Sequence, residues 1–196
     1  MSDPRLERWL DALLVTPGLT AIQDRDDARA MLLEDALHGV RIVGKLPGPI
    51  VDVGSGGGSP GIPLAAALPE REVTLLEANA RKVRFLETIA ADFPNVTVLR
   101  GRAEEQETDR YGVATAKALA SPPVALEWLL PLVEPGGSAV LWVGPGADLD
   151  QLRRASEQLA GGLPEVRDGL VVVAKLEATP AGFPRRPGMA RKRPLA

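Results

Sequence analysis

Residues 51–65 read Val-Asp-Val-Gly-Ser-Gly-Gly-Gly-Ser-Pro-Gly-Ile-Pro-Leu-Ala, a short apolar run that passes into a glycine cluster and then into a second apolar segment. Gly54, Gly56 and Gly58 stand where a strand is expected to turn into a helix, so the backbone can approach a ligand closely there. In open α/β sheets, ligands bind at the carboxyl ends of the strands. We therefore expect a ligand site at this loop.

Short apolar runs alternate with helical segments on both sides of the loop. Strands are predicted at residues 50–53, 73–76, 96–99, 113–116 and 139–143, and helices at 62–68, 80–92, 123–133 and 147–159. A last strand is predicted at 170–174, with an antiparallel position at the sheet edge as one option. The alternation predicts an α/β fold, a doubly wound and mostly parallel sheet covered by helices on both faces.

Apolar side chains at helical spacing also precede the sheet. One stripe runs from Leu6 to Leu14 and a second from Met31 to Leu37, and Pro17-Gly18 separates them. We predict an N-terminal helical cap over residues 1–46, a ligand-binding domain over 47–180, and a tail over 181–196 that belongs to the same domain.

The composition excludes several classes of protein. Hydrophobic residues make up 45% of the 196 residues and charged residues 25%, which suits a globular domain with a core. No run approaches the roughly 18 apolar residues of a membrane span, and residues 1–10 mix acids and bases where a signal peptide would be apolar. With no cysteine either, we expect a cytoplasmic protein.

The same counts restrict the chemistry. A chain without cysteine has no thiol nucleophile and no thiolate metal site. A single histidine, His38, makes a catalytic triad or a multi-histidine metal centre improbable, so we expect no metal. We interpret His38 as a structural residue near a helix end.

Charge is distributed unevenly along the chain. The last sixteen residues carry five basic side chains and no acidic one, whereas the rest carries eight more acidic than basic residues. The basic residues are Arg185, Arg186, Arg191, Lys192 and Arg193. This asymmetry suggests an anionic partner bound at one place, and a solubilising tail is the alternative.

A carboxylate suggests what the glycine loop binds. Glu77 ends the second predicted strand, 23 residues after Gly54, and a carboxylate there can accept hydrogen bonds from both hydroxyls of a ribose. Glu77 and the adjacent Ala78 therefore point to a nucleoside-containing cofactor. NAD and S-adenosylmethionine both satisfy this description.

Three residues around the loop favour S-adenosylmethionine. Pro60 and Pro63 remove N–H donors from the helix start, where a pyrophosphate would need them. Asp52 adds a negative charge near the same place, which suits the amino and sulfonium groups of S-adenosylmethionine and repels a pyrophosphate.

Further along the chain, the motifs resemble those of class I methyltransferases, which have a Rossmann-like fold. The blocks VDVGSGGGSPGIPLA (51–65), LLEANARKVRFLE (75–87), GRAEE (101–105), ATAKALASPPVALEWLLPLVEPGG (114–137) and FPRRPGMARKRPL (183–195) are similar to the RsmG family, also called GidB. In class I methyltransferases Pro-Gly-Gly, here residues 135–137, precedes the fifth strand. The resemblance runs from about residue 19 to the end. It implies transfer of a methyl group from S-adenosylmethionine to guanine N7 in 16S ribosomal RNA.

The resemblance also implies site residues. Gly54, Ser59 and Glu77 correspond to positions beside the cofactor, and Ala103-Glu104 to the pair near the adenine. Lys117 stands where the family usually has an arginine, and we expect it to act in catalysis and in cofactor binding. The full predicted cofactor set is Asp52, Gly54, Gly56, Ser59, Glu77, Ala78, Ala103, Glu104 and Lys117, and the five basic tail residues are expected to contact RNA. The expected partner is 16S rRNA or the small ribosomal subunit, met by a monomer.

The chain also departs from the family pattern. Leu32 and Ala36 replace the histidine and serine of a His-x-x-Asp-Ser-Leu segment, and Gly18 replaces the asparagine of Asn-Leu-Thr. Because lysine does not reproduce the bidentate contacts of arginine, Lys117 adds to the departures. Two alternatives therefore stay open: an RsmG-like enzyme with a different substrate, and a non-catalytic protein that binds S-adenosylmethionine or RNA.

Three further expectations concern the chemistry and the tail. Guanine N7 carries a free lone pair, so methylation there needs no general base. Ser121-Pro122-Pro123-Val124 resembles an adenine-methylation motif but lacks its aromatic residue, and we interpret it as a helix start. Phe183 could stack on an RNA base, and the apolar residues around it could equally pack the tail onto the domain.

Overall fold

The computed structural model describes residues 3–144 and 146–196. The N-terminal helices are α1 Pro4–Val15, α2 Arg25–Ala28, the π-helical turn η1 Arg29–Glu34, α3 Asp35–His38 and α4 Val40–Val43. The strands are β1 Ile50–Val53, β2 Val73–Glu77, β3 Val96–Arg100, β4 Tyr111–Lys117, β5 Val133–Trp142, β6 Glu165–Arg167 and β7 Leu170–Ala174. The remaining helices are α5 Gly61–Ala67, α6 Ala80–Ala90, the 3-10 turn η2 Ala103–Glu105, α7 Pro122–Leu129, the 3-10 turn η3 Leu130–Leu132, α8 Leu149–Gln158 and α9 Met189–Lys192.

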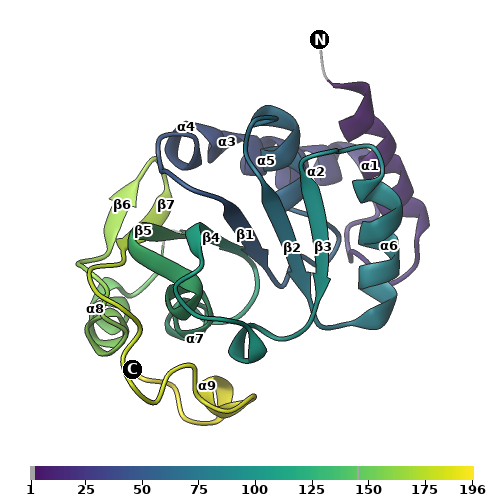
Figure 1. Cartoon of the computed structure of the whole chain (residues 1–196). Helices are drawn as coiled ribbons and strands as arrows, with labels where there is room; N and C mark the ends of the chain where they lie inside the picture. Colours follow the sequence, from purple (N-terminus) through teal and green to yellow (C-terminus); the bar gives the residue numbers. More distant parts are fainter. Residues whose placement is uncertain (1–2, 145) are drawn as a thin grey trace.

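The strands form one sheet in the order β3-β2-β1-β4-β5-β7-β6 (Figure 1). The first five strands in chain order pair in parallel, and β7 runs antiparallel to both β5 and β6. The strand order reverses between β1 and β4, which places the glycine loop after β1 at the switch point of the sheet. The predicted doubly wound, mostly parallel sheet is confirmed.

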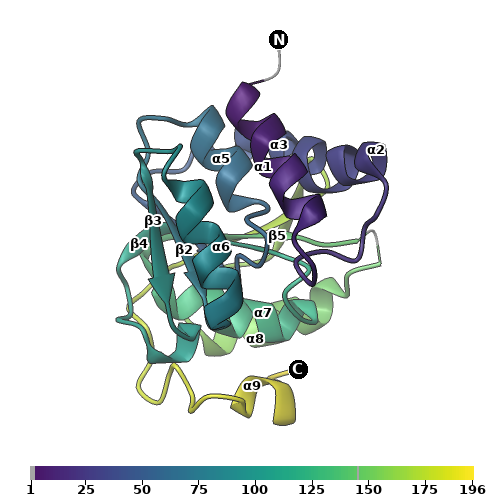
Figure 2. The ribbon, with the colours of Figure 1, turned by 90° about the vertical axis from the view of Figure 1, so that its right-hand side faces the viewer.

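Helices cover both faces of the sheet. Figures 1 and 2 show α5 and α6 on one face, together with the N-terminal helices, and α7 and α8 on the other. Neighbouring side chains of β1 divide accordingly, because Ile50 packs into one hydrophobic cluster and Val51 into the other. Burial on both faces explains why the central strands β1 and β4 are mainly apolar in the sequence.

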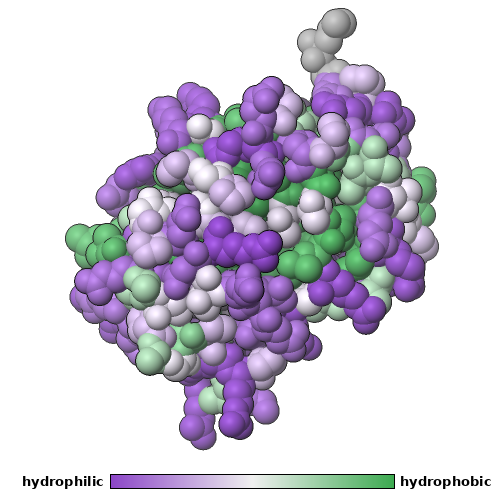
Figure 3. Space-filling model, viewed as in Figure 1, coloured by the Kyte–Doolittle hydropathy of each residue, from purple (hydrophilic) through white to green (hydrophobic). Residues whose placement is uncertain are grey.

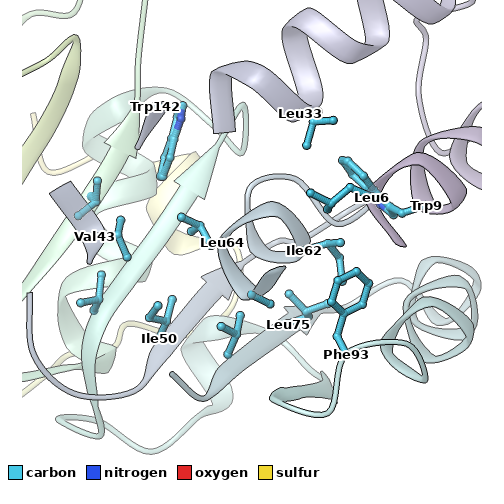
Figure 4. Close-up of a cluster of buried hydrophobic side chains, with 14 of the residues drawn as sticks. Leu6, Trp9, Leu33, Val43, Ile50, Ile62, Leu64, Leu75, Phe93 and Trp142 are labelled. Atoms are coloured by element: carbon cyan, nitrogen blue, oxygen red, sulfur yellow. The ribbon is translucent and has the colours of Figure 1, made fainter. Parts of the chain in front are cut away.

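Helix α1 packs its apolar stripe against the first cluster. Leu6 and Trp9 lie beside Ile62 of α5 and near Phe93 in Figure 4, and all four are buried. The indole Nε1 of Trp9 also donates a hydrogen bond to the carbonyl oxygen of Gly57, at 2.8 Å. The predicted N-terminal helices therefore hold the glycine loop from outside the sheet.

The second predicted stripe folds differently from a regular helix. Residues 25–43 form short pieces that include η1, in which bonding runs from i to i+5 and the helical repeat of side chains is lost. Leu33 is buried whereas Met31, predicted to lie in the stripe, is 56% exposed, and two residues this far apart on a helix point to nearly opposite sides.

The sheet also differs from prediction at its second edge. Strand β5 begins at Val133, so it includes the Pro-Gly-Gly that we expect to precede it. Gly137 packs closely on Gly112, because a Cβ on Gly137 would lie 2.4 Å from the carbonyl oxygen of Gly112. The short polar strand β6 was not predicted, so β7 is antiparallel as considered but is not the edge. The helix predicted at 123–133 ends at Leu129, and Pro131 lies in the 3-10 turn that follows.

The C-terminal segment, residues 183–196, packs back onto the domain. It runs below α7 in Figures 1 and 2, and Phe183 and Leu195 pack against the second hydrophobic cluster. Within residues 3–144 and 146–196, no helix combines the length and the apolar character that crossing a membrane requires. The surface in Figure 3 is largely hydrophilic, with hydrophobic areas at the left edge of the view and across its middle and right-hand side.

Candidate cofactor site

The glycine loop turns sharply because its backbone adopts conformations that favour glycine. Gly54, Gly56 and Gly58 have φ values of +68°, +58° and +102°. A Cβ on Gly54 would lie 2.3 Å from Cδ1 of Leu119, which follows β4. Only glycine at this position leaves both Leu119 and the space beside it undisturbed.

Glu77 fixes the loop and still has capacity to bind a ligand. Its Oε2 accepts a hydrogen bond from the Gly56 N–H at 3.0 Å, and its Oε1 accepts one from the Asn79 N–H at 2.7 Å. Each carboxylate oxygen can accept a second hydrogen bond. The buried carboxylate therefore suits the paired hydroxyls of a ribose.

A cavity of about 360 Å³ lies at the carboxyl ends of β1, β2 and β4, which is within the usual size range of small-molecule sites. Five of the predicted cofactor residues line it, namely Gly54, Glu77, Ala78, Ala103 and Glu104. Its other lining residues are Val53, Leu76, Lys82, Gly101, Arg102, Ala118, Leu119, Trp128, Gly188 and Arg191. The structure thus brings together residues from six separate stretches of the chain.

A smaller cavity of about 170 Å³ adjoins the first across Gly54. Three other predicted residues line it, Gly56, Ser59 and Lys117, beside residues of the N-terminal cap. The Ser59 hydroxyl donates to the carbonyl oxygen of Leu32 at 2.7 Å. Gly54, Lys82 and Ala118 line both cavities, so together the two could hold an elongated ligand that bends around the loop.

Lys117 joins the end of β4 to the helical cap. Its Nζ donates to the carbonyl oxygen of Met31 at 2.6 Å and forms an ion pair with Asp35. Asp35 is the aspartate of the segment in which Leu32 and Ala36 depart from the family pattern. Burial lowers the pKa of Lys117 to about 8, so its environment is poorer in water than that of a surface lysine.

Asp52 lies beneath the loop and lines neither of the two cavities. Its carboxylate accepts hydrogen bonds from the Gly61 N–H and the Thr115 hydroxyl, each at 3.2 Å. Burial raises the pKa of Asp52 to about 7. The expectation that Asp52 faces a ligand is therefore not met in this structure, because its hydrogen bonds turn it toward the start of α5.

Comparison with known proteins identifies the family of this chain. The profile of the GidB family, described as rRNA small subunit methyltransferase G, matches residues 5–161. The chain belongs to this family. Proteins named ribosomal RNA small subunit methyltransferase G are 36% identical in Synechococcus elongatus (91% of this chain, 82% of the relative) and 34% identical in Chloroflexus aggregans (97% and 89%).

Solved structures show the same fold as this GidB-family chain. A putative S-adenosyl-L-methionine-dependent methyltransferase from Methanococcus maripaludis has a TM-score of 0.58 at 12% identity, over 80% of this chain and 92% of the other. The T. thermophilus 16S rRNA N2 G1207 methyltransferase, solved with AdoMet and guanosine, has a TM-score of 0.56 at 17% identity, over 76% and 40%. The family and the fold confirm the prediction of a methyltransferase that uses S-adenosylmethionine.

The basic residues of the GidB-family tail occupy two kinds of environment. Arg186, Lys192 and Arg193 are exposed. Arg185 instead binds the buried Glu127 of α7, with its Nε donating to Oε1 at 2.6 Å, and this hydrogen bond raises the pKa of Arg185. Its guanidinium is therefore engaged inside the protein, where the sequence led us to expect an RNA contact.

Sequence reasoning missed several residues of the larger cavity. Trp128 sits in a predicted helix, and nothing in its spacing distinguishes it from a core residue. Gly188 and Arg191 belong to a tail that was assigned to RNA. Lys82 follows the expected start of a helix, and its position four residues after Ala78 is the one signal that could have suggested it.

Proposed function

We propose that this chain transfers a methyl group from S-adenosylmethionine to N7 of a guanosine in 16S ribosomal RNA. The observation that supports it best is the paired cavity around Gly54 in a chain whose relatives are named ribosomal RNA small subunit methyltransferase G. A 16S rRNA substrate would place the enzyme in the cytoplasm, and we propose that it acts there as a monomer.

The residues of the two cavities fit the two ends of the cofactor. Glu77 would accept hydrogen bonds from the ribose hydroxyls, and Ala103 and Glu104 line the same cavity. Ser59 and Lys117 would lie by the amino-acid end in the smaller cavity. The cofactor supplies a sulfonium-bound methyl group, and the protein's task is to orient the acceptor toward it.

Proton transfer is not needed for the proposed reaction. The N7 lone pair of guanine attacks the methyl carbon while the carbon–sulfur bond breaks, and the positive charge passes from sulfur to the base. Holding the two reactants in line can contribute up to about 7–11 kcal/mol.

A third cavity, of about 510 Å³, could receive the base. It is lined by Ala120–Pro123 after β4 and by described residues of 143–151 after β5. Residues 120–123 directly follow Ala118 and Leu119, which line the cofactor cavity, so the same loop after β4 contributes to both cavities. Gln151 and Ser121 are polar groups there that could bind the edge of a purine.

The exposed basic residues of the tail are the proposed contacts to RNA phosphates. Arg186, Lys192 and Arg193 contribute three positive charges near one end of the sheet. If all three neutralise phosphates, they should contribute about −2 to −3 to the slope of log affinity against log salt. Replacing all three with alanine should flatten the slope by that amount.

Methyl transfer to unmodified small-subunit RNA and to small-subunit particles tests the proposal. S-adenosylmethionine with a labelled methyl group provides the signal, and mass spectrometry of the nucleosides locates the label. We expect one guanosine to carry it at N7. RNA transcribed with 7-deazaguanosine, which lacks N7, is the matched control and should accept no label.

Two results would contradict the proposal. Label that persists in 7-deazaguanosine RNA would place the methyl on another atom. No transfer to either RNA or particles, with cofactor binding intact, would favour a different substrate or a binding protein without activity.

A further inference from the structure

The C-terminal segment forms one wall of the cofactor cavity of about 360 Å³ around Gly54 and Glu77. The ion pair between Arg185 and Glu127 attaches the segment to α7, and the Gly188 N–H donates a hydrogen bond to Oε1 of Glu104 at 3.2 Å. Gly188, Glu104 and Arg191 all line the cavity. The segment therefore spans from α7 to η2 across the outer side of the cavity.

Arg191 is held over an aromatic ring at this wall. Its Cζ lies 5.2 Å from the centre of the Trp128 ring, and its Nη2 donates to the carbonyl oxygen of Leu119 at 3.4 Å. A guanidinium at this distance from an indole face makes a cation–π contact. Trp128, Leu119 and Arg191 all line the cavity, so the stack is part of the cofactor site.

The indole of Trp128 carries a further signal of a ligand. Its Nε1–H is buried and has no acceptor among the described residues. Buried polar atoms without partners are rare in native proteins, so each one calls for an explanation. Here the unpartnered donor belongs to a residue that lines the cavity and lies under Arg191.

The chemistry of the cofactor decides which part of it suits this wall. The amino-acid end carries a sulfonium, an ammonium and a carboxylate, so its net charge is positive, and we assign it to the smaller cavity, which Arg191 does not line. The adenine ring is flat, uncharged and rich in acceptor nitrogens, and guanidinium and indole planes stack well on such rings. Glu77, which suits the ribose, lines the same cavity.

We propose that Arg191, supported by Trp128, closes the adenine end of the cofactor cavity, so that the C-terminal segment is part of the cofactor site and not only an RNA contact. Tail docking and cofactor binding then stabilise each other, because free-energy coupling is reciprocal. S-adenosylmethionine should slow hydrogen exchange of amides in residues 183–196, in the absence of RNA.

Calorimetry of cofactor binding without RNA tests the proposal. The variants are Arg191→Ala and Arg191→Lys, with Arg154→Ala on the exposed side of α8 as the matched control. The ligands are S-adenosylmethionine and adenosine. We expect Arg191→Ala to bind both about tenfold more weakly, which is about 1.4 kcal/mol, and Arg191→Lys to resemble it because lysine lacks the planar group.

Each outcome bears on the proposal. Equal losses for the two ligands, with Arg154→Ala unchanged, support the adenine end. Unchanged or tighter binding of the two ligands by Arg191→Ala overturns the proposal. A loss of affinity for S-adenosylmethionine alone, with adenosine binding unchanged, also overturns it. So does wild-type affinity for both ligands in Arg191→Lys. Thermal unfolding without ligand checks that the exposed Arg191 is dispensable for folding. Because RNA is absent, failure here leaves the proposed RNA substrate untouched, and failure of RNA methylation leaves this result standing.

Discussion

Replacing Arg185 with alanine should release the C-terminal segment from α7. The guanidinium makes two hydrogen bonds to the Glu127 carboxylate, and its Nη2 also donates to the carbonyl oxygen of Arg193 at 2.9 Å. Arg185→Ala would leave a buried carboxylate without its cation. The segment would detach so that water can reach Glu127.

The exposure of the two side chains sets the expected size of the effect. Breaking a buried ion pair by removing one partner costs about 3–5 kcal/mol, but surface pairs are worth about 0–1 kcal/mol. Glu127 is 3% exposed and Arg185 is 23% exposed. The pair is therefore closer to the buried case, and we expect a loss of about 2–4 kcal/mol, or roughly 30- to 1,000-fold in the docking equilibrium.

Hydrogen exchange measured by mass spectrometry reads this equilibrium directly, because local opening controls the exchange of protected amides. Amides such as those of Lys192 and Arg193, which bond to Gly188 and Met189 carbonyls, should lose protection in Arg185→Ala. Arg186→Ala is the matched control, because it removes the same charge from an exposed position in the same segment.

A double variant separates the ion pair from simple loss of side-chain packing. Glu127→Leu with Arg185→Met replaces both charges with apolar groups of similar size, which is often neutral for a buried pair. We expect it to recover most of the protection. Equal protection in Arg185→Ala and Arg186→Ala would refute the reasoning, since the pair would then contribute nothing to docking.

Three further predictions concern the site itself. Gly54→Ala should weaken S-adenosylmethionine binding at least tenfold by calorimetry, because its φ of +68° strains alanine and its Cβ would displace Leu119; unchanged affinity would contradict this. Lys117→Ala should reduce methyl transfer far more than the thermal unfolding temperature, whereas Lys117→Arg, which can still reach Asp35, should keep or raise activity. Asp52→Asn should raise the free energy of unfolding in urea more at pH 8 than at pH 5, and the gain at pH 8 should exceed the gain at pH 5 by roughly 2–3 kcal/mol. The folded protein holds a proton on Asp52 up to about pH 7, whereas the unfolded chain releases it near the ordinary pKa of 3.8. The free energy of unfolding of the wild type therefore falls as pH rises between these two values. If Asp52→Asn changed the free energy of unfolding by the same amount at pH 5 and pH 8, Asp52 would not titrate in this range.

The amino-acid sequence was sufficient to predict the parallel part of the sheet and the presence of a cavity at the glycine loop. Strands β1, β2 and β4 are largely buried, so they are visible as short, mainly apolar runs such as Ile50–Val53, in which Asp52 is the one polar residue. The glycines after β1 and the carboxylate of Glu77 are local requirements of a tight turn and of ribose recognition. Such requirements act within a few residues and leave a trace in the sequence.

Other features needed the tertiary structure. The three-residue β6 is exposed and has no apolar pattern of its own, since it is held by pairing with β7. The direction of the Asp52 carboxylate depends on Gly61 and Thr115, which meet it only when α5 and β4 are in place. Met31 is exposed and Leu33 is buried, because the packing of this helix against the core decides which side of it faces inward.

The tail shows most clearly where sequence reasoning ends. Its five positive charges are equal in the sequence, yet Arg185 binds Glu127, Arg191 lies over Trp128, and the other three face solvent. The partners stand 58 and 63 residues away along the chain. Charge and composition are properties of the chain itself, whereas the partner of each charge is chosen by packing between segments that are distant in sequence.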